Sequence, residues 1–154
     1  MKIFPLLASG LLFHSVALVA TAAEWLGPDE KIAGRFAAHH LEPLLAENKP
    51  GKDENIKAVP LFRSERASNV LVQVRDREPL HRHADSDITV FLLRGEGDMR
   101  IGKEALPVKA GSVIHIPRGV VHAYINRGPE PAAALVVYSP APGPKDRILV
   151  EDKP

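Results

Sequence analysis

The sequence predicts an all-β fold of the antiparallel barrel or sandwich type, preceded by one amphipathic helix. Short runs of β-type residues, separated by turn residues, fill the chain from about residue 58 onward, and no second long helical pattern accompanies them. In one run Val70, Val72 and Val74 alternate with different side chains, as a strand with two distinct faces requires. The predicted strands cover roughly 58–63, 69–75, 88–93, 97–101, 112–116, 120–126, 133–138 and 147–150.

The first 22 residues have the pattern of an export signal. Lys2 precedes an apolar run from Ile3 to Ala20, and Ala20-Thr21-Ala22 forms a small-x-small cleavage site. An uncleaved membrane anchor is the alternative, but proline, glycine, serine and histidine residues dilute the run and the small-residue exit favours cleavage. We therefore predict a signal peptide over 1–22 and an exported chain with no stable membrane insertion after cleavage. The compartment is the periplasm if the source is a Gram-negative bacterium.

A helical pattern follows the signal, from Pro28 to about Glu47. Its apolar residues recur at spacings of three and four, and they are Ile32, Phe36, Ala37, Leu41, Leu44 and Leu45. Pro43 predicts a kink in this helix. Residues 48–55 are polar and rich in turn formers, so we expect residues 23–55 to form a helix and linker ahead of a barrel domain over 56–150.

Length and composition restrict the classes of function. A chain of 154 residues fits one domain. Its formal net charge is only +1, whereas a protein that binds nucleic acid usually has a strongly basic surface, so we expect no nucleic-acid partner. The sequence has no cysteine, which excludes disulfides, thiol nucleophiles and cysteine-ligated zinc. Any metal ion must therefore be held by nitrogen and oxygen atoms.

Three histidines have the spacing of a metal site. His81 and His83 are two residues apart, so in an extended segment both imidazoles point to the same face and can bind one ion. His122 lies on a later predicted strand, with Tyr124 and Asn126 at the same parity. Three imidazoles from neighbouring strands leave open coordination positions for water or substrate.

These residues resemble a known family, the cupins. Gly111, Pro117, Gly119, His122 and Asn126 fit every fixed position of the second cupin motif, G-x5-P-x-G-x2-H-x3-N. His81, His83 and Gly95 fit the first motif, G-x5-H-x-H-x3,4-E-x6-G, and fifteen residues separate Gly95 from Gly111, as in bacterial members. The resemblance implies a double-stranded β-helix, also called a jelly-roll barrel, over about residues 56–150.

The chain departs from the first cupin motif at two positions. Arg75 replaces the first glycine, which serves a turn. Ile88 stands where the usual ligand glutamate would be, and Asp87 beside it is a candidate fourth ligand only if the strand slips by one residue. Asp85 is a weaker candidate. The resemblance therefore implies a site of three histidines, with Asp87 as an optional fourth ligand.

The resemblance also implies a cofactor and partners. The expected cofactor is one divalent ion, namely Fe, Zn, Mn or Ni, among which imidazole ligands do not discriminate. The expected partners are a small-molecule ligand or substrate and a second copy of the chain in a homodimer. The protein is then a metalloenzyme, either dioxygenase-like or a Lewis-acid isomerase or lyase, or else a non-catalytic protein that binds a metal and a small ligand.

Two further residues are candidates for catalysis. His115 is a candidate proton shuttle if its strand turns the ring into the cavity. The alternative is a histidine on the surface or in the core that has no catalytic role, and this is also our interpretation of His39 and His40. Tyr124 is a candidate to orient a substrate or supply a proton, and the alternative is a barrel-lining aromatic that only packs.

Overall fold

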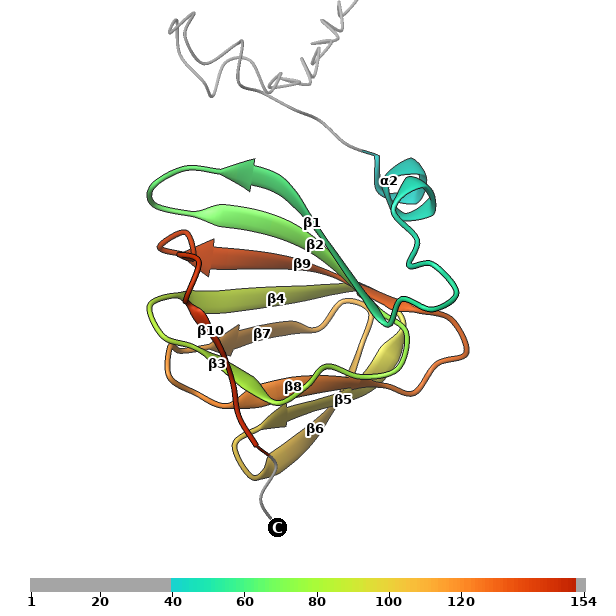
Figure 1. Cartoon of the computed structure of the whole chain (residues 1–154). Helices are drawn as coiled ribbons and strands as arrows, with labels where there is room; N and C mark the ends of the chain where they lie inside the picture. The colour runs from blue at the N-terminus through green and yellow to red at the C-terminus, as the bar shows by residue number, and fades with distance from the viewer. Residues whose placement is uncertain (1–39, 152–154) are drawn as a thin grey trace, which may run out of the picture. The chain divides into compact units, whose positions relative to one another are not determined.

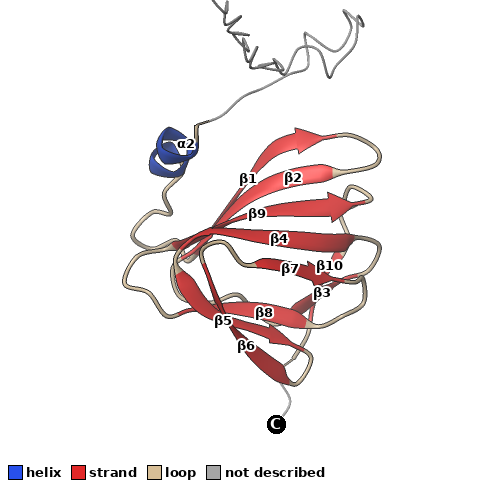
Figure 2. Cartoon of the chain, turned by 180° about the vertical axis from the view of Figure 1, so that it is seen from behind, coloured by secondary structure: helices blue, strands red, loops and turns tan. Residues whose placement is uncertain are grey.

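The computed structural model describes residues 40–151, which form two five-stranded antiparallel sheets and one short helix (Figure 1). The first sheet has the order β1 (Ile56–Arg63), β2 (Ser68–Val74), β9 (Ala132–Ser139), β4 (Asp87–Arg94) and β7 (Val113–Ile116). The second has the order β10 (Arg147–Leu149), β3 (His81–His83), β8 (His122–Asn126), β5 (Glu96–Ile101) and β6 (Glu104–Lys109). Figure 2 shows the two sheets as the two walls of a jelly-roll barrel. The predicted all-β fold is confirmed.

All eight predicted strands are present, and two further strands were missed. β3 has only three residues and pairs with β8 at a single position, so its run is too short to give a pattern. β6 contains Pro107 and is exposed at every position except Val108, so it shows no alternation. β6 is an edge strand, and its outer side has no partner strand that would need a backbone N–H donor. A proline, which has no N–H, is therefore tolerated there.

The core lies between the two sheets. Every second residue of β4 points inward, so Ile88, Val90 and Leu92 are buried while the residues between them are not. They pack with Met99 of β5 and with inward side chains of other strands. This alternation builds a barrel whose interior is apolar except where histidine, tyrosine and glutamate enter it.

Helix α2 (Leu41–Glu47) covers part of the outer face of the first sheet. Leu45 packs on Leu71 and Ala133, and the side-chain amide of Gln73 donates to the carbonyl oxygens of Leu45 and Asn48 at 3.3 and 2.8 Å. This part of the predicted helix is confirmed, whereas residues 28–39 lie outside the described residues, as does the predicted signal peptide. Among residues 40–151 no helix has the length and hydrophobicity that a membrane span requires.

Pro43 falls in the first turn of α2, so the predicted kink inside a longer helix is not what the described residues show. The helix begins at Leu41, and a first-turn residue has no intrahelical partner for its amide. Proline is therefore tolerated at this position. An ion pair between Glu42 and Arg94 of β4 connects the helix to the sheet.

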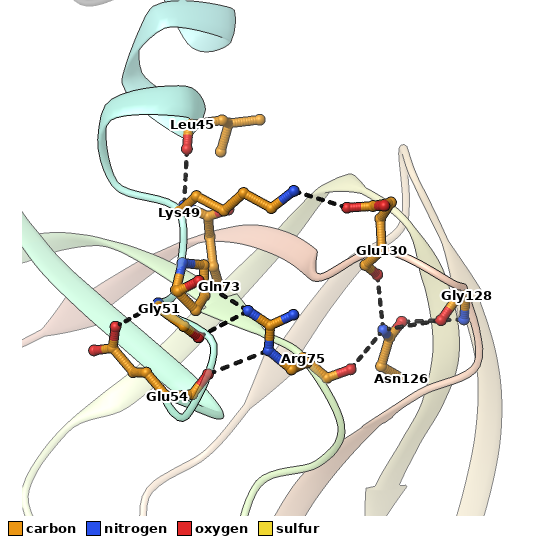
Figure 3. A network of polar contacts seen from close by, with 10 residues as sticks. Leu45, Lys49, Gly51, Glu54, Gln73, Arg75, Asn126, Gly128 and Glu130 are labelled. Carbon is orange, nitrogen blue, oxygen red and sulfur yellow. Dashed lines mark hydrogen bonds and ion pairs between the residues drawn. The ribbon is translucent and has the colours of Figure 1, made fainter.

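The departure from the cupin motif at Arg75 has a structural use (Figure 3). The guanidinium of Arg75 donates to the carbonyl oxygens of Pro50 and Gly51 at 2.8 and 2.9 Å, which holds the linker against the end of β2. The side-chain amide of Asn126 in turn donates to the carbonyl oxygen of Arg75 at 2.9 Å and to that of Glu130 at 2.8 Å. Asn126 thus bonds backbone groups in the same network that fixes the linker.

Candidate metal centre and its cavity

The strand register brings the three predicted histidines together. His81 of β3 lies directly opposite His122 of β8, and His83 follows two residues later on the same face. All three are buried, with 3, 4 and 3% of the surface of His81, His83 and His122 exposed. One ring nitrogen from each lies within 4.8 Å of the other two, so the three can face a single ion.

Hydrogen bonds on the outer side of each ring orient the imidazoles. The Nδ1 atom of His81 lies 2.9 Å from the carbonyl oxygen of Pro79, and that of His122 lies 3.0 Å from the carbonyl oxygen of Val120. A carbonyl oxygen only accepts, so each Nδ1 carries the proton and each Nε2 keeps its lone pair. Metal-binding histidines have this arrangement, in which the far nitrogen donates and the near one coordinates. The donor set therefore fits a divalent ion.

Burial keeps the imidazoles of His81 and His122 neutral. Loss of solvation and, to a smaller extent, the neighbouring His122 together lower the pKa of His81 to about 3, although the bond to the carbonyl of Pro79 opposes the shift. Burial also lowers the pKa of His122 to about 4, although its bond to the carbonyl of Val120 opposes the shift. Neutral imidazole is the form that binds metal, so both rings are ready to coordinate at neutral pH.

Asp146 completes the orientation of the third ring, and sequence reasoning missed it. Its Oδ2 atom accepts from Nδ1 of His83 at 2.7 Å, and its Oδ1 atom accepts from the amides of Asp85 and Ser86 at 2.7 and 3.0 Å. Burial opposes its ionisation, but these three bonds outweigh burial and hold the pKa of the carboxyl below its usual value. The residue precedes β10 and is 1% exposed. No local pattern marks it, because its partners lie about sixty residues away.

A small cavity of about 50 Å³ adjoins the imidazoles. Tyr124 lines it, and the tyrosine hydroxyl is buried without a hydrogen-bond partner among the described residues. Burial, with help from nearby acidic groups, raises the pKa of Tyr124 to about 12, so the hydroxyl keeps its proton. The ring lies over Gly97, where an added Cβ would come within 2.6 Å of the hydroxyl oxygen. The structure therefore places Tyr124 in the cavity wall, with a hydroxyl donor that no described residue engages.

Glu78 is a second cavity residue that sequence reasoning missed. It lines the same cavity, and its Oε2 atom accepts from the amide of Tyr124 at 3.2 Å. Burial raises the pKa of its carboxyl, and the amide of Tyr124 and the charge of Arg147 oppose this shift only in part. Glu78 lies upstream of His81, where the cupin motif has no acidic position, so nothing in the sequence marks it.

The structure does not bring Asp87 and His115 to this site. Asp87 has the opposite parity from the cavity-lining Ile88, and its carboxylate accepts from the amide of Arg118 at 2.8 Å. No bulge turns it inward, because the pairing of Asp87 and Ile88 with β9 is continuous. His115 is exposed on the outside of β7, where its ring contacts Thr89 at 3.3 Å, so it cannot serve the cavity as a proton shuttle.

The fold and site define a class of protein, a jelly-roll barrel with a buried three-histidine centre beside a small cavity. The sequence profile described as Cupin domain matches residues 69–138. An uncharacterized protein of Aquifex aeolicus is 33% identical over 107 residues, which cover 70% of this chain and 88% of that protein. The chain belongs to the cupin superfamily.

Two solved structures show the same fold. A protein of Klebsiella pneumoniae with a double-stranded β-helix domain superposes with a TM-score of 0.63 at 20% identity, and the match covers 75% of this chain and all of that one. The nucleoside dehydratase Pac13 of Streptomyces, also solved with uridine, gives a TM-score of 0.56 at 19% identity, covering 68% of this chain and 87% of Pac13. At these identities the likeness concerns the fold alone.

Proposed function

We propose that this cupin is a metal-dependent enzyme that moves a proton on a small molecule, as an isomerase or lyase does. The observation that carries the proposal is a carboxyl of raised pKa, Glu78, in the cavity that the three imidazoles adjoin. An acid or base beside the ion distinguishes an enzyme from a protein that only holds a ligand. The likeness to Pac13, a dehydratase, agrees with this class of reaction.

The chain's own residues divide the work as follows. The Nε2 atoms of His81, His83 and His122 hold the ion, which supplies Lewis-acid polarisation of a substrate oxygen when bound. Tyr124 donates its free hydroxyl to the substrate and orients it. Glu78 takes a proton from one substrate position and returns it to another, which a carboxyl of raised pKa does well near neutral pH. The apolar lining excludes water from the transfer.

The sequence of residues 1–22 supports export, so we propose that the reaction takes place outside the cytoplasm, in the periplasm if the source is Gram-negative. Pairing into a homodimer, which is common in cupins, is part of the proposal. Export is checked by N-terminal sequencing of protein from its natural source, which should begin at Ala23. Pairing is checked by the mass of the purified protein in solution.

The first test is the metal itself. Elemental analysis should find about one ion per chain in the wild type and a loss of that ion in His122→Ala, as expected for a centre built from three ligands. His115→Ala is the matched control, because His115 lies outside the barrel and its loss should leave the metal content unchanged. Equal loss in both variants, or retention in both, would disprove the site.

The second test addresses the reaction. The metal-loaded protein is mixed with small hydroxy and carbonyl compounds in deuterated water, and exchange at carbon is followed by NMR. We expect exchange in the wild type and its loss in Glu78→Gln, which keeps the size of the side chain but cannot carry the proton. Exchange that survives in Glu78→Gln, with the metal retained, would refute the role of Glu78. A metal-loaded wild type without exchange would favour a binding protein, and iron with oxygen consumption would favour a dioxygenase.

A further inference from the structure

Arg147 lies on β10, the strand that pairs with the histidine-bearing strand β3. β10 pairs with β3 so that Arg147 lies directly opposite His83 and Leu149 directly opposite His81. Side chains of directly opposed residues emerge on the same face of a sheet, so both point to the side that carries the metal ligands. Both are nevertheless exposed, Leu149 to 63%, because β10 is the edge strand. Arg147 is not among the residues that line the cavity, but it lies at the exposed edge of the sheet whose inner face carries the metal ligands.

The guanidinium of Arg147 makes no hydrogen bond or ion pair with any residue of the described part of the chain. The neighbouring carboxylate of Asp146 is occupied by His83 and by two backbone amides. One oxygen of Glu78 is likewise taken by the amide of Tyr124. The charge of Arg147 still reaches the cavity, since it opposes the raised pKa of Glu78 and adds to the lowered pKa of His81.

The backbone at Arg147 is firmly held. The preceding residue, Asp146, is buried, and its carbonyl oxygen accepts from the amide of Ala84 at 2.8 Å. At the other end of β10, the amide of Val150 donates to the carbonyl oxygen of Leu80 at 2.9 Å. An arginine fixed at both sides, with its donors free, is arranged to bind a planar anion through two parallel hydrogen bonds.

We propose that Arg147 binds the carboxylate of the small molecule that reaches the three-histidine centre, so that the natural ligand is a small organic acid. This inference rests on the proposed function for the location of the ligand. A single guanidinium suits the one negative charge of a carboxylate, and Glu78 in the same cavity disfavours an anion of higher charge such as phosphate. Arg147 acts in binding and orientation, and the proton transfer remains with Glu78.

The test uses glycolate, its neutral amide glycolamide, and inorganic phosphate, each titrated by calorimetry into zinc-loaded and metal-free protein. We expect glycolate to bind the zinc-loaded wild type, and Arg147→Gln to weaken that binding by about tenfold, the effect of one charge-assisted contact at a solvated position. Arg147→Lys should recover part of the affinity. Glycolamide should bind the wild type as weakly as glycolate binds Arg147→Gln.

Arg82→Gln is the matched control. Arg82 lies between the two histidines of β3 but is exposed on the opposite face, so its loss should leave glycolate binding unchanged. Equal binding of glycolate by wild type and Arg147→Gln, no binding of glycolate at all, or tighter binding of phosphate than of glycolate would overturn the inference. If the wild type holds no zinc yet binds glycolate through Arg147, the proposed metalloenzyme fails while the assignment of Arg147 stands.

Discussion

The bond between Asp146 and His83 gives the sharpest prediction about the metal centre. In Asp146→Asn one oxygen remains to accept from the amides of Asp85 and Ser86, but an NH2 group replaces the oxygen that accepts from Nδ1 of His83. An NH2 group cannot accept, so the imidazole must either lose this partner or move its proton to Nε2. Nε2 is the nitrogen that faces the centre, and once protonated it cannot bind a metal.

The size of the effect follows from the geometry. The lost bond is short, at 2.7 Å, and joins two side chains that are 5 and 1% exposed, so water does not replace it. Loss of such an outer partner of a metal-binding histidine lowers metal affinity by about 10- to 100-fold, or about 1.4–2.7 kcal/mol. The metal-free protein should also lose about 1–3 kcal/mol in its free energy of unfolding, the contribution of a bond to a charged group.

The measurement is a competition titration of zinc against a chromophoric chelator at pH 7.5, together with a thermal melt of the metal-free protein. Asp98→Asn is the control, because Asp98 is also a paired aspartate, bound to Arg127 at 2.8 Å, but does not line the cavity. Asp98→Asn should bind zinc like the wild type. If folded Asp146→Asn also bound zinc like the wild type, Asp146 would not orient His83 and the reasoning would be refuted.

Three further predictions concern stability. Gly97→Ala places a Cβ 2.2 Å from a carbonyl oxygen of the neighbouring strand, so we expect a loss of about 1–3 kcal/mol, whereas Gly143→Ala enters open space and should melt like the wild type. Gln73→Ala removes the two bonds that hold the end of α2, and hydrogen exchange of amides 41–48 should become faster while that of β4 does not. In the metal-free protein the lowered pKa values of His81 and His122 mean that the unfolded chain binds more protons below pH 6.5, so stability should fall by several kcal/mol from pH 6.5 towards pH 4. The raised pKa of Glu78 has the opposite effect on stability, but it is a single group, whereas two histidines have lowered pKa values. A melting temperature that does not change between pH 7 and pH 4.5 would contradict the prediction.

Most of the fold was predictable because its determinants are local. Inward residues such as Val72 and Val90 recur at every second position, and glycines stand where the chain must turn: Gly95 and Gly119 have φ values of 90° and 81°. The strands that were missed lack these signals. β3 is defined by its partners on both sides rather than by its own sequence, and β6 is an exposed edge strand.

The candidate site was predictable only where its residues share a short motif. His81 and His83 share a face by their spacing, and the cupin motif fixes the place of His122. Asp146 and Glu78 could not be found in this way, because each gains its role from contacts that the folded chain makes over long sequence distances. The same limit explains why His115 was wrongly considered for the cavity. A shift of one residue in register turns every side chain of a strand to the other face, and the register of β7 against β4 places His115 on the outer face.

The three imidazoles and their outer partners together favour a functional centre over an inherited remnant. The ring nitrogens of three imidazoles converge on one point at the wall of the cavity, and no other side chain of the described residues takes up this convergent set of lone pairs. Packing alone would be served better by apolar side chains, which the rest of the barrel uses. The outer hydrogen bonds point the same way, since a ring kept only for packing has no need of Asp146, a buried carboxylate. The arrangement becomes favourable when the centre binds a divalent ion, and the affinity lost in Asp146→Asn would measure how far the protein has prepared the site for it.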